Sequence, residues 1–242
     1  MRPPGGRVYH KWPPSTFLSR LRQETRDELL QQGVAKRYSP HQPLLIQGDS
    51  SRHVLLITRG VVKVTASSES GFDVLLAVRI AGDLVGEMAA FEELPRSGTV
   101  EACSEVDVRI IQLRVLESFL TDHPDAMKAM LRMLSARLRW ANRRRVDYRA
   151  YDASTRFARV LAELGQSYAQ PVPGGDGKRC ELGVTLNQRE LASLAGLALP
   201  TAEKCLAALT AQGLVECSYR NITICDVPKL LEFAKLGGEI PY

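Results

Sequence analysis

GEMAAFEELPRSGTV, residues 86–100, is the stretch of the sequence on which the fold assignment depends. It begins with a glycine and brings a carboxylate, a guanidinium and two hydroxyls to one short turn. The planar guanidinium of Arg96 suits a phosphate, and backbone N–H groups with the hydroxyl of Ser97 or Thr99 would bond its remaining oxygens. The carboxylate of Glu87 would accept a hydrogen bond from a ribose hydroxyl. These groups suit a sugar phosphate, although from these residues alone a surface loop is the favoured interpretation.

Short β-rich runs flank this stretch on both sides. They cover residues 44–49, 54–64 and 74–78 before it and 106–113 after it, with glycines between them. Short strands at fairly regular spacing, separated by glycine turns, are typical of an antiparallel sandwich or roll. The stretch is therefore expected to lie in a β-roll.

The order of glycines and strands resembles the cyclic-nucleotide-binding domain of the Crp/Fnr family of bacterial transcription regulators. In that family the phosphate-binding cassette reads approximately Gly-Glu-Leu, a short helical turn, and Arg-Ser-Ala-Thr-Val. The matching residues here are Gly86, Glu87, Met88, Arg96, Ser97, Gly98, Thr99 and Val100. The resemblance implies that Arg96 meets a cyclic phosphate and Glu87 the ribose, so a cyclic nucleotide is the candidate effector. Gly98 replaces the usual alanine, from which we expect a less preorganised backbone.

Composition and charge favour a two-domain cytoplasmic protein. The 242 residues are 45% hydrophobic and 24% charged, which is ordinary for a globular protein. No apolar run is long enough to span a bilayer, and the N-terminal residues lack a signal-peptide core, so no membrane partner is expected. The net charge of +5 comes from residues 1–150, with 23 Lys+Arg against 17 Asp+Glu, because residues 151–242 hold 9 against 10.

The metal-ligating and nucleophilic residue types form no recognisable site. The five cysteines include no C-x-x-C pair and the four histidines are scattered, so we expect reduced, mostly buried thiols and no metal. The resemblance disfavours an iron–sulfur sensor, because those relatives use cysteines near the N-terminus. No nucleophile–base pair or P-loop is visible, which predicts no catalytic residues and no enzyme activity.

A long helix is predicted over residues 123–150, with Asp122 as its N-cap and Pro124 in its first turn. Apolar residues recur along it at alternating spacings of four and three, which is typical of a coiled-coil seam. The seam consists of Met127, Leu131, Leu134, Leu138, Ala141 and Tyr148, together with the charged Arg145. Arginines are expected on the other faces, at positions 132, 137, 139, 143, 144 and 149. We predict a parallel homodimer through this helix, as the resemblance also implies.

The resemblance also places an adenine-reading pair on this helix. The family's cyclic AMP receptors carry hydroxyl residues there, and the matching positions here are Ala141 and Asn142. Asn142 keeps a donor and an acceptor, whereas Ala141 has neither. The phosphate–ribose half of the site is therefore present, while the base-reading half departs from the family.

A winged helix-turn-helix is predicted in the C-terminal part. Asn187 would cap one helix, Gly196 would make the turn and a second helix would begin near Pro200. Residues 212–216 and 222–224 predict a two-stranded wing. The second helix would enter the major groove of double-stranded DNA, and the alternative is a helix pair without a DNA role.

The base-reading residues of this helix also depart from the family. Many members carry Arg-Glu and a later Arg, where this chain has Leu199, Pro200 and Lys204. Thr201, Glu203 and Lys204 remain as candidate readers of base edges. Candidate phosphate contacts are Lys178, Arg179, Arg189 and Arg220.

The expected fold is α+β: an N-terminal extension and helix (1–29), a β-roll (30–122), a dimerisation helix (123–150) and a winged helix-turn-helix domain (151–242). The expected function is a homodimeric DNA-binding regulator controlled by a small ligand, with RNA polymerase as a partner if it activates transcription. Three alternatives remain: a regulator with a vestigial pocket, a haem-based gas sensor of the same fold, and a nucleotide hydrolase.

Overall fold

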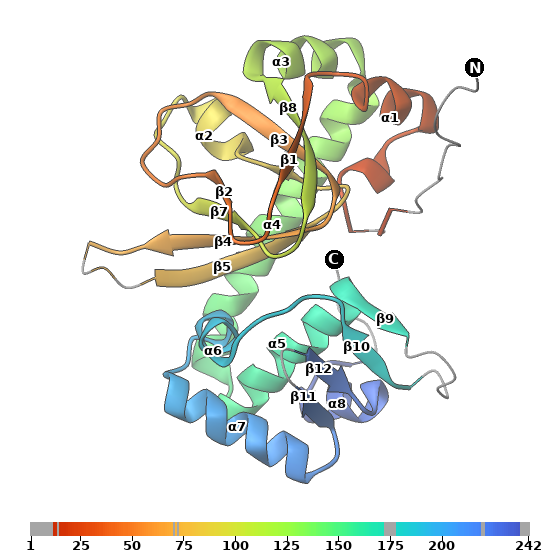
Figure 1. Cartoon of the computed structure of the whole chain (residues 1–242). Helices are drawn as coiled ribbons and strands as arrows, with labels where there is room; N and C mark the ends of the chain where they lie inside the picture. Colours follow the sequence, from red (N-terminus) through yellow and green to blue (C-terminus); the bar gives the residue numbers. More distant parts are fainter. Residues whose placement is uncertain are drawn as a thin grey trace.

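The computed structural model describes residues 12–13, 15–69, 71, 73–171, 178–218 and 221–237. A β-roll at the N-terminal end is joined by one long helix to a C-terminal helical domain (Figure 1). The α+β class and this order of parts, both expected from the sequence, are confirmed.

The roll consists of two four-stranded antiparallel sheets, ordered β1-β8-β3-β6 and β2-β7-β4-β5. Its strands are β1 (Val34–Tyr38), β2 (Pro43–Leu45), β3 (His53–Arg59), β4 (Val61–Ser67), β5 (Asp73–Ile80), β6 (Leu84–Val85), β7 (Thr99–Ala102) and β8 (Val106–Gln112). The short helices η1 (Leu18–Arg20) and α1 (Gln23–Leu29) precede it. Fully buried side chains such as Leu55, Ile57 and Val62 fill the space between the sheets, which explains the apolar runs in the sequence.

Two consecutive helices, α3 (Leu113–Asp122) and α4 (Pro124–Ala150), leave the roll. The prediction of Asp122 as the N-cap of α4 is wrong, because Asp122 is the last residue of α3 and His123 occupies the N-cap without a side-chain cap bond. The residue before a proline is disfavoured in the helical region, so the chain must break at His123. Among the described residues no helix, α4 included, is long and apolar enough to cross a membrane.

The C-terminal domain packs four helices on a small sheet. The helices are α5 (Ala153–Tyr168), α6 (Gln188–Ala195), α7 (Leu199–Ala211) and α8 (Val227–Phe233). The strands are β9 (Ala169–Pro171), β10 (Cys180–Leu182), β11 (Val215–Ser218) and β12 (Asn221–Ile224). The predicted two-stranded wing is β11 and β12, but β10 and β9 extend it to four strands. Neither added strand was predicted, because each is only three residues long.

The C-terminal domain is docked on the β4–β5 hairpin of the roll. Leu75 and Val78 of β5 belong to the same buried cluster as the core of α5, α6 and α7. The Leu75 amide donates a hydrogen bond to Ser193 Oγ at 2.7 Å, and the Tyr168 hydroxyl donates to the Val78 carbonyl at 3.0 Å. Lys63 Nζ of β4 lies 3.0 Å from Glu190 Oε1 of α6. The roll therefore contacts the DNA-binding part directly as well as through α4.

All five cysteines are free thiols, but the expectation that most are buried is wrong. Cys205 is buried and Cys217 exposed, and the other three are partly buried. Burial raises the pKa of the Cys103 thiol to about 11, so it stays protonated at neutral pH. Within the described ranges no group of three or more His, Cys, Asp or Glu side chains is arranged to hold a metal ion.

A surface ion pair joins α1 to α4 and gives a pH-dependent prediction. Arg22 donates from Nε and Nη2 to Asp125 at 3.2 Å, and Thr25 Oγ1 donates at 2.9 Å. The bond from Arg22 is the largest cause that lowers the pKa of Asp125 to about 2. Because the folded pKa is depressed, this stabilisation is present above about pH 4 and is lost as the pH falls toward 2.

Asp125→Asn is therefore expected to lower stability at pH 7 but to leave it unchanged near pH 2. Urea unfolding midpoints at pH 7, 4, 3 and 2 measure the difference between the variant and the wild type. Asp27→Asn, an exposed change on α1, is the control. A difference that stays constant across this range would contradict the prediction.

Candidate ligand cassette and nucleic-acid interface

The cassette begins where β6 ends at Gly86. This residue has a φ of 84° and precedes α2 (Glu87–Glu92). A Cβ at Gly86 would lie 2.8 Å from both Arg96 Nη1 and Leu45 Cδ1. Glycine is required here both by the left-handed backbone and by the close approach of Arg96.

Arg96 is the buried centre of the cassette, with 3% of its surface exposed. Its Nη1 donates to the Gly86 carbonyl at 2.6 Å, and its Nη2 donates to the His53 carbonyl at 2.6 Å and to Ser51 Oγ at 3.2 Å. Burial lowers the pKa of the guanidinium, although nearby acidic side chains oppose this effect. Two of its three nitrogen atoms are thus engaged with the chain itself, while Nε is buried without a hydrogen-bond partner among the described residues. Through its two carbonyl partners Arg96 ties β3 to the start of α2.

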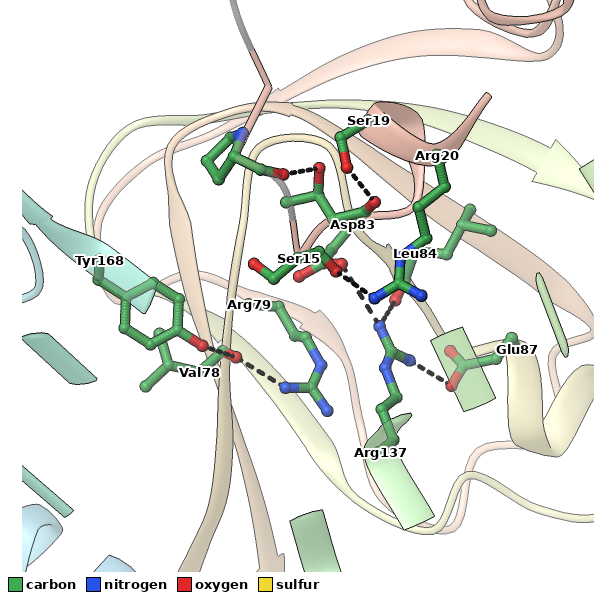
Figure 2. Close-up of polar contacts among 12 residues, drawn as sticks. Ser15, Ser19, Arg20, Val78, Arg79, Asp83, Leu84, Glu87, Arg137 and Tyr168 are labelled. Atoms are coloured by element: carbon green, nitrogen blue, oxygen red, sulfur yellow. Dashed lines mark hydrogen bonds and ion pairs between the residues drawn. The ribbon is translucent and has the colours of Figure 1, made fainter. Parts of the chain in front are cut away.

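Glu87 of α2 is also buried, with 4% of its surface exposed, and it contacts the long helix. Its Oε1 lies 2.5 Å from Arg137 Nη1, and Arg137 Nη2 donates to the Leu84 carbonyl at 2.8 Å (Figure 2). Arg137 thus lies on a face of α4 other than the seam, as expected. The roll covers that face of the helix, and a carboxylate of the cassette pairs with the arginine.

The remaining cassette residues lie around the turn that leads into β7. Ser97 is exposed, while Thr99 Oγ1 accepts a hydrogen bond from the Gln47 amide at 3.1 Å. A Cβ at Gly98 would lie 2.7 Å from the Thr65 carbonyl oxygen of β4. The close packing of β4 thus explains why this chain lacks the alanine of the family pattern at this position.

The seam of α4 is largely uncovered in the single chain. Met127, Leu131, Leu138 and Tyr148 are 40–62% exposed, and Ala141 and Arg145 are exposed as well. Leu134 is partly buried against the roll, because the opposite face of α4 packs there through Ala129, Met130 and Met133. An exposed apolar stripe on a helix whose other face is already packed favours a partner helix.

Two further predicted ligand residues are exposed. Met88 on α2 is 52% exposed, and Asn142 on α4 is exposed without a hydrogen bond to any described residue. The structure therefore brings Glu87 and Arg96 together at the cassette but does not add Asn142 to them within one chain. A base contact from Asn142 stays a prediction.

The helix-turn-helix forms as the sequence analysis predicted. Asn187 Oδ1 accepts from the Glu190 amide at 2.9 Å and Glu190 Oε2 accepts from the Asn187 amide at 2.9 Å, which completes a capping box at α6. Gly196 makes the turn with a φ of 61°. Figure 1 shows α7 on the side of this domain that faces away from the roll. Glu203 and Lys204 are exposed on α7.

The other predicted DNA contacts differ in availability. Thr201 is partly buried, whereas Lys178 and Arg189 are exposed. Arg179 Nη2 lies 2.7 Å from Glu216 Oε2, so its charge is already partly compensated. Arg220 lies outside the described residues.

Two family models cover most of the chain. The model of the cyclic nucleotide-binding domain matches residues 35–123, and that of the Crp-like helix-turn-helix domain matches residues 155–233. A CRP-like cAMP-activated global transcriptional regulator of Mycobacterium tuberculosis is 26% identical over 189 residues, which are 78% of this chain and 83% of that protein. The cAMP-activated global transcriptional regulator CRP of Salmonella typhimurium is 24% identical over 190 residues, 78% of this chain and 88% of that protein.

Solved structures show the same fold. The c-di-GMP responsive global regulator CLP of Xanthomonas campestris superposes with a TM-score of 0.70 at 22% identity, covering 84% of this chain and 99% of that one. A CooA mutant from Carboxydothermus hydrogenoformans superposes with a TM-score of 0.69 at 22% identity, covering 86% of this chain and 90% of that one. Because both domain models match in order along the chain, it belongs to the Crp/Fnr family of bacterial transcription regulators.

Proposed function

We propose that this chain is a homodimeric DNA-binding transcription regulator whose affinity for its operator is set by a small ligand in the roll. The proposal rests on two features of α4. One face of this helix holds the exposed seam, and Arg137 on another face is bound to Glu87 of the cassette. A change at the cassette therefore acts on the element that positions two DNA-reading domains.

A cyclic nucleotide is the effector class that the cassette favours. Glu87 and Arg96 supply the groups for ribose and phosphate, and the relatives from two organisms are named for activation by cAMP. A ribose hydroxyl at Glu87 would compete with Arg137 for the carboxylate, which gives the ligand a direct route to α4. Because Ala141 replaces a hydroxyl residue of the family pattern, a nucleotide other than cAMP is an equal candidate.

A regulator with a vestigial pocket is the second candidate. The engagement of Arg96 with two carbonyls and a hydroxyl favours it, because a phosphate would have to displace those bonds. Calorimetry with a panel of cyclic mono- and dinucleotides separates the two candidates. Tight operator binding by the ligand-free protein, together with no heat from any nucleotide, would favour the vestigial pocket.

DNA binding is tested with the predicted readers of α7. Selection of bound fragments from genomic DNA identifies the operator, which a symmetric dimer should make palindromic. Lys204→Ala is then expected to cost about 1–3 kcal/mol at the operator and less at a scrambled site, because Lys204 lies where base edges would be read.

Arg189→Ala is the matched comparison. Loss of a phosphate contact should weaken binding to both DNA sites equally and reduce the slope of log affinity against log salt concentration by about 1. Fluorescence anisotropy at several salt concentrations measures these effects. Lys229→Ala on α8 is the control. Unchanged affinity in both test variants would contradict the assignment of α7 as the reading helix.

A further inference from the structure

A cavity of about 110 Å³ lies where the roll, α4 and α5 meet, apart from the groups that surround Arg96. Three parts of the molecule line it: Arg79 of β5, Met133, Ala136 and Trp140 of α4, and Leu164 of α5. The cavity thus lies on the contact between the roll and the DNA-binding domain. Anything bound in it would touch both.

Arg79 is the one guanidinium on the wall of this cavity that has no carboxylate within ion-pair distance among the described residues. Its recorded hydrogen bond runs from Nη1 to the Val78 carbonyl at 2.9 Å. Desolvation lowers the pKa of Arg79, and the charge of Arg137 lowers it further. Figure 2 shows the side chains of Arg79 and Arg137 reaching toward the same region from β5 and α4. The charges of Asp83 and Glu87 oppose this lowering of the Arg79 pKa, but both carboxylates lie within ion-pair distance of Arg137 rather than of Arg79.

The acidic groups beside the cavity already have cationic partners. Glu163 Oε2 accepts from Arg144 Nη2 at 2.6 Å and from Trp140 Nε1 at 3.0 Å. Asp83 lies 3.8 Å from Arg137 Nη2, and burial raises the pKa of its carboxyl. Arg144 Nε is buried without a hydrogen-bond partner among the described residues. Of the three guanidinium groups on the wall, Arg79 is therefore the one without an ion pair among the described residues.

Apart from the charged groups and the hydroxyl-bearing Ser15, Ser167 and Tyr168, the wall is apolar. Met133, Ala136 and Leu164 present alkyl groups and Trp140 presents an indole ring to the cavity. An engineered apolar cavity of about 150 Å³ is large enough to bind benzene, so this one suits a body no larger than one ring. A ligand with one anionic end and an apolar body of that size would match both the guanidinium of Arg79 and the apolar part of the wall.

We propose that this cavity is a second ligand site, which takes a small organic carboxylate with its anionic end on Arg79 and its apolar body against α4. The site is distinct from the phosphate-binding residues of the cassette, because neither Arg96 nor Ser97 lines the cavity, although Arg137 on its wall also binds Glu87. Since β5, α4 and α5 all contribute to the wall, an occupant holds the DNA-binding domain in its docked position. Its binding is therefore expected to change the affinity for DNA.

Trp140 gives a direct readout of binding. The sequence contains two tryptophans, so Trp12→Phe leaves Trp140 as the one source of indole fluorescence. Benzoate added to the full-length Trp12→Phe protein is expected to change this fluorescence saturably in the millimolar range. Inorganic phosphate, which lacks an apolar body, and benzyl alcohol, which lacks a charge, are expected to have at least tenfold weaker effects.

Two substitutions in this background test the two walls separately. Arg79→Gln removes the charge at similar size, and Ala136→Leu fills the cavity while every charge stays in place. Each is expected to weaken benzoate binding at least tenfold, whereas Arg114→Gln, an exposed change on α3, leaves it unchanged. Circular dichroism and melting temperatures establish whether the variants fold. If one of the two test variants does not fold, the other alone tests the proposal.

Benzoate binding that survives both substitutions, an equal response to phosphate or benzyl alcohol, or no response to benzoate would each overturn the proposal. Failure of the cassette has a different signature. If no cyclic nucleotide binds but benzoate does so through Arg79, the second site stands and the effector assignment of the cassette falls.

Discussion

Arg96→Ala is expected to lower the free energy of unfolding by about 2–4 kcal/mol and to abolish calorimetric binding of any cyclic nucleotide. The stability loss follows from the Gly86 and His53 carbonyls, which would lose the charged donor that now lies 2.6 Å from each. A buried acceptor left without its partner costs about 1–3 kcal/mol. Guanidinium chloride denaturation at pH 7 measures the change, and calorimetry with the nucleotide panel measures the second effect.

Two further arginine variants separate the geometry of Arg96 from its charge. Arg96→Lys keeps the charge but replaces the planar fork, whose two terminal nitrogens each reach one carbonyl, with a single nitrogen, so it should recover only part of the stability. Arg52→Ala is the control, because Arg52 and its partner Glu93 are both more than half exposed and such pairs contribute little. If Arg96→Ala unfolds like the wild type, Arg96 does not brace the cassette. If it also leaves ligand and DNA binding unchanged, the cassette is a relic of the fold.

Sequence patterns predicted the parts of this molecule that depend on local periodicity or on single special residues. The four-and-three spacing from Met127 to Tyr148 predicted a long helix with one uncovered apolar face, which is α4. Gly86 and Gly196 were expected at turns, and both have the positive φ that glycine tolerates. Asn187 was expected as a cap, and its capping box depends on residues only three positions apart.

The partners of the arginines could not be predicted in the same way. Arg137 and Arg144 were expected on faces of α4 other than the seam, but nothing in the sequence indicated that they pair with Glu87 and Glu163, which lie about 50 and 20 residues away. Helical periodicity defines which residues share a face but not which other element packs on that face. The carbonyl partners of Arg96 are similarly hidden, because backbone acceptors carry no sequence signal.

These long-range pairs connect α4 both to the cassette and to the first helix of the C-terminal domain. Arg137 binds the cassette near the middle of the helix, and Arg144, two turns later, binds Glu163 of α5. The β4–β5 hairpin adds a second connection through Lys63 and Glu190, where Glu190 also completes the cap of α6. A shift of the roll relative to α4 would therefore change the contact between Lys63 and Glu190 at the start of the helix-turn-helix.

Leu131→Glu combined with Leu138→Glu is expected to convert the dimer to monomers and to weaken operator binding at least 100-fold. Both leucines lie on the seam and are 59% and 62% exposed in the single chain. In a parallel dimer the seam positions of the two chains face each other, so the substitutions bring carboxylates together across the interface. A dimer binds its second half-site as an intramolecular event, an advantage of about 10²–10⁴ that monomers lose.

Sedimentation velocity measures the oligomeric state, and anisotropy with the selected operator measures the affinity. Val34→Glu is the matched control, because Val34 is 69% exposed on β1, outside the seam. The two seam leucines are absent from the buried clusters, so the double variant should keep the thermal unfolding of a folded monomer, apart from the stabilisation that dimer formation adds. A double variant that still sediments as a dimer would show that another surface joins the chains. Binding of DNA by that variant at wild-type affinity would show that one reading domain is enough, which would remove α4 from the proposed mechanism.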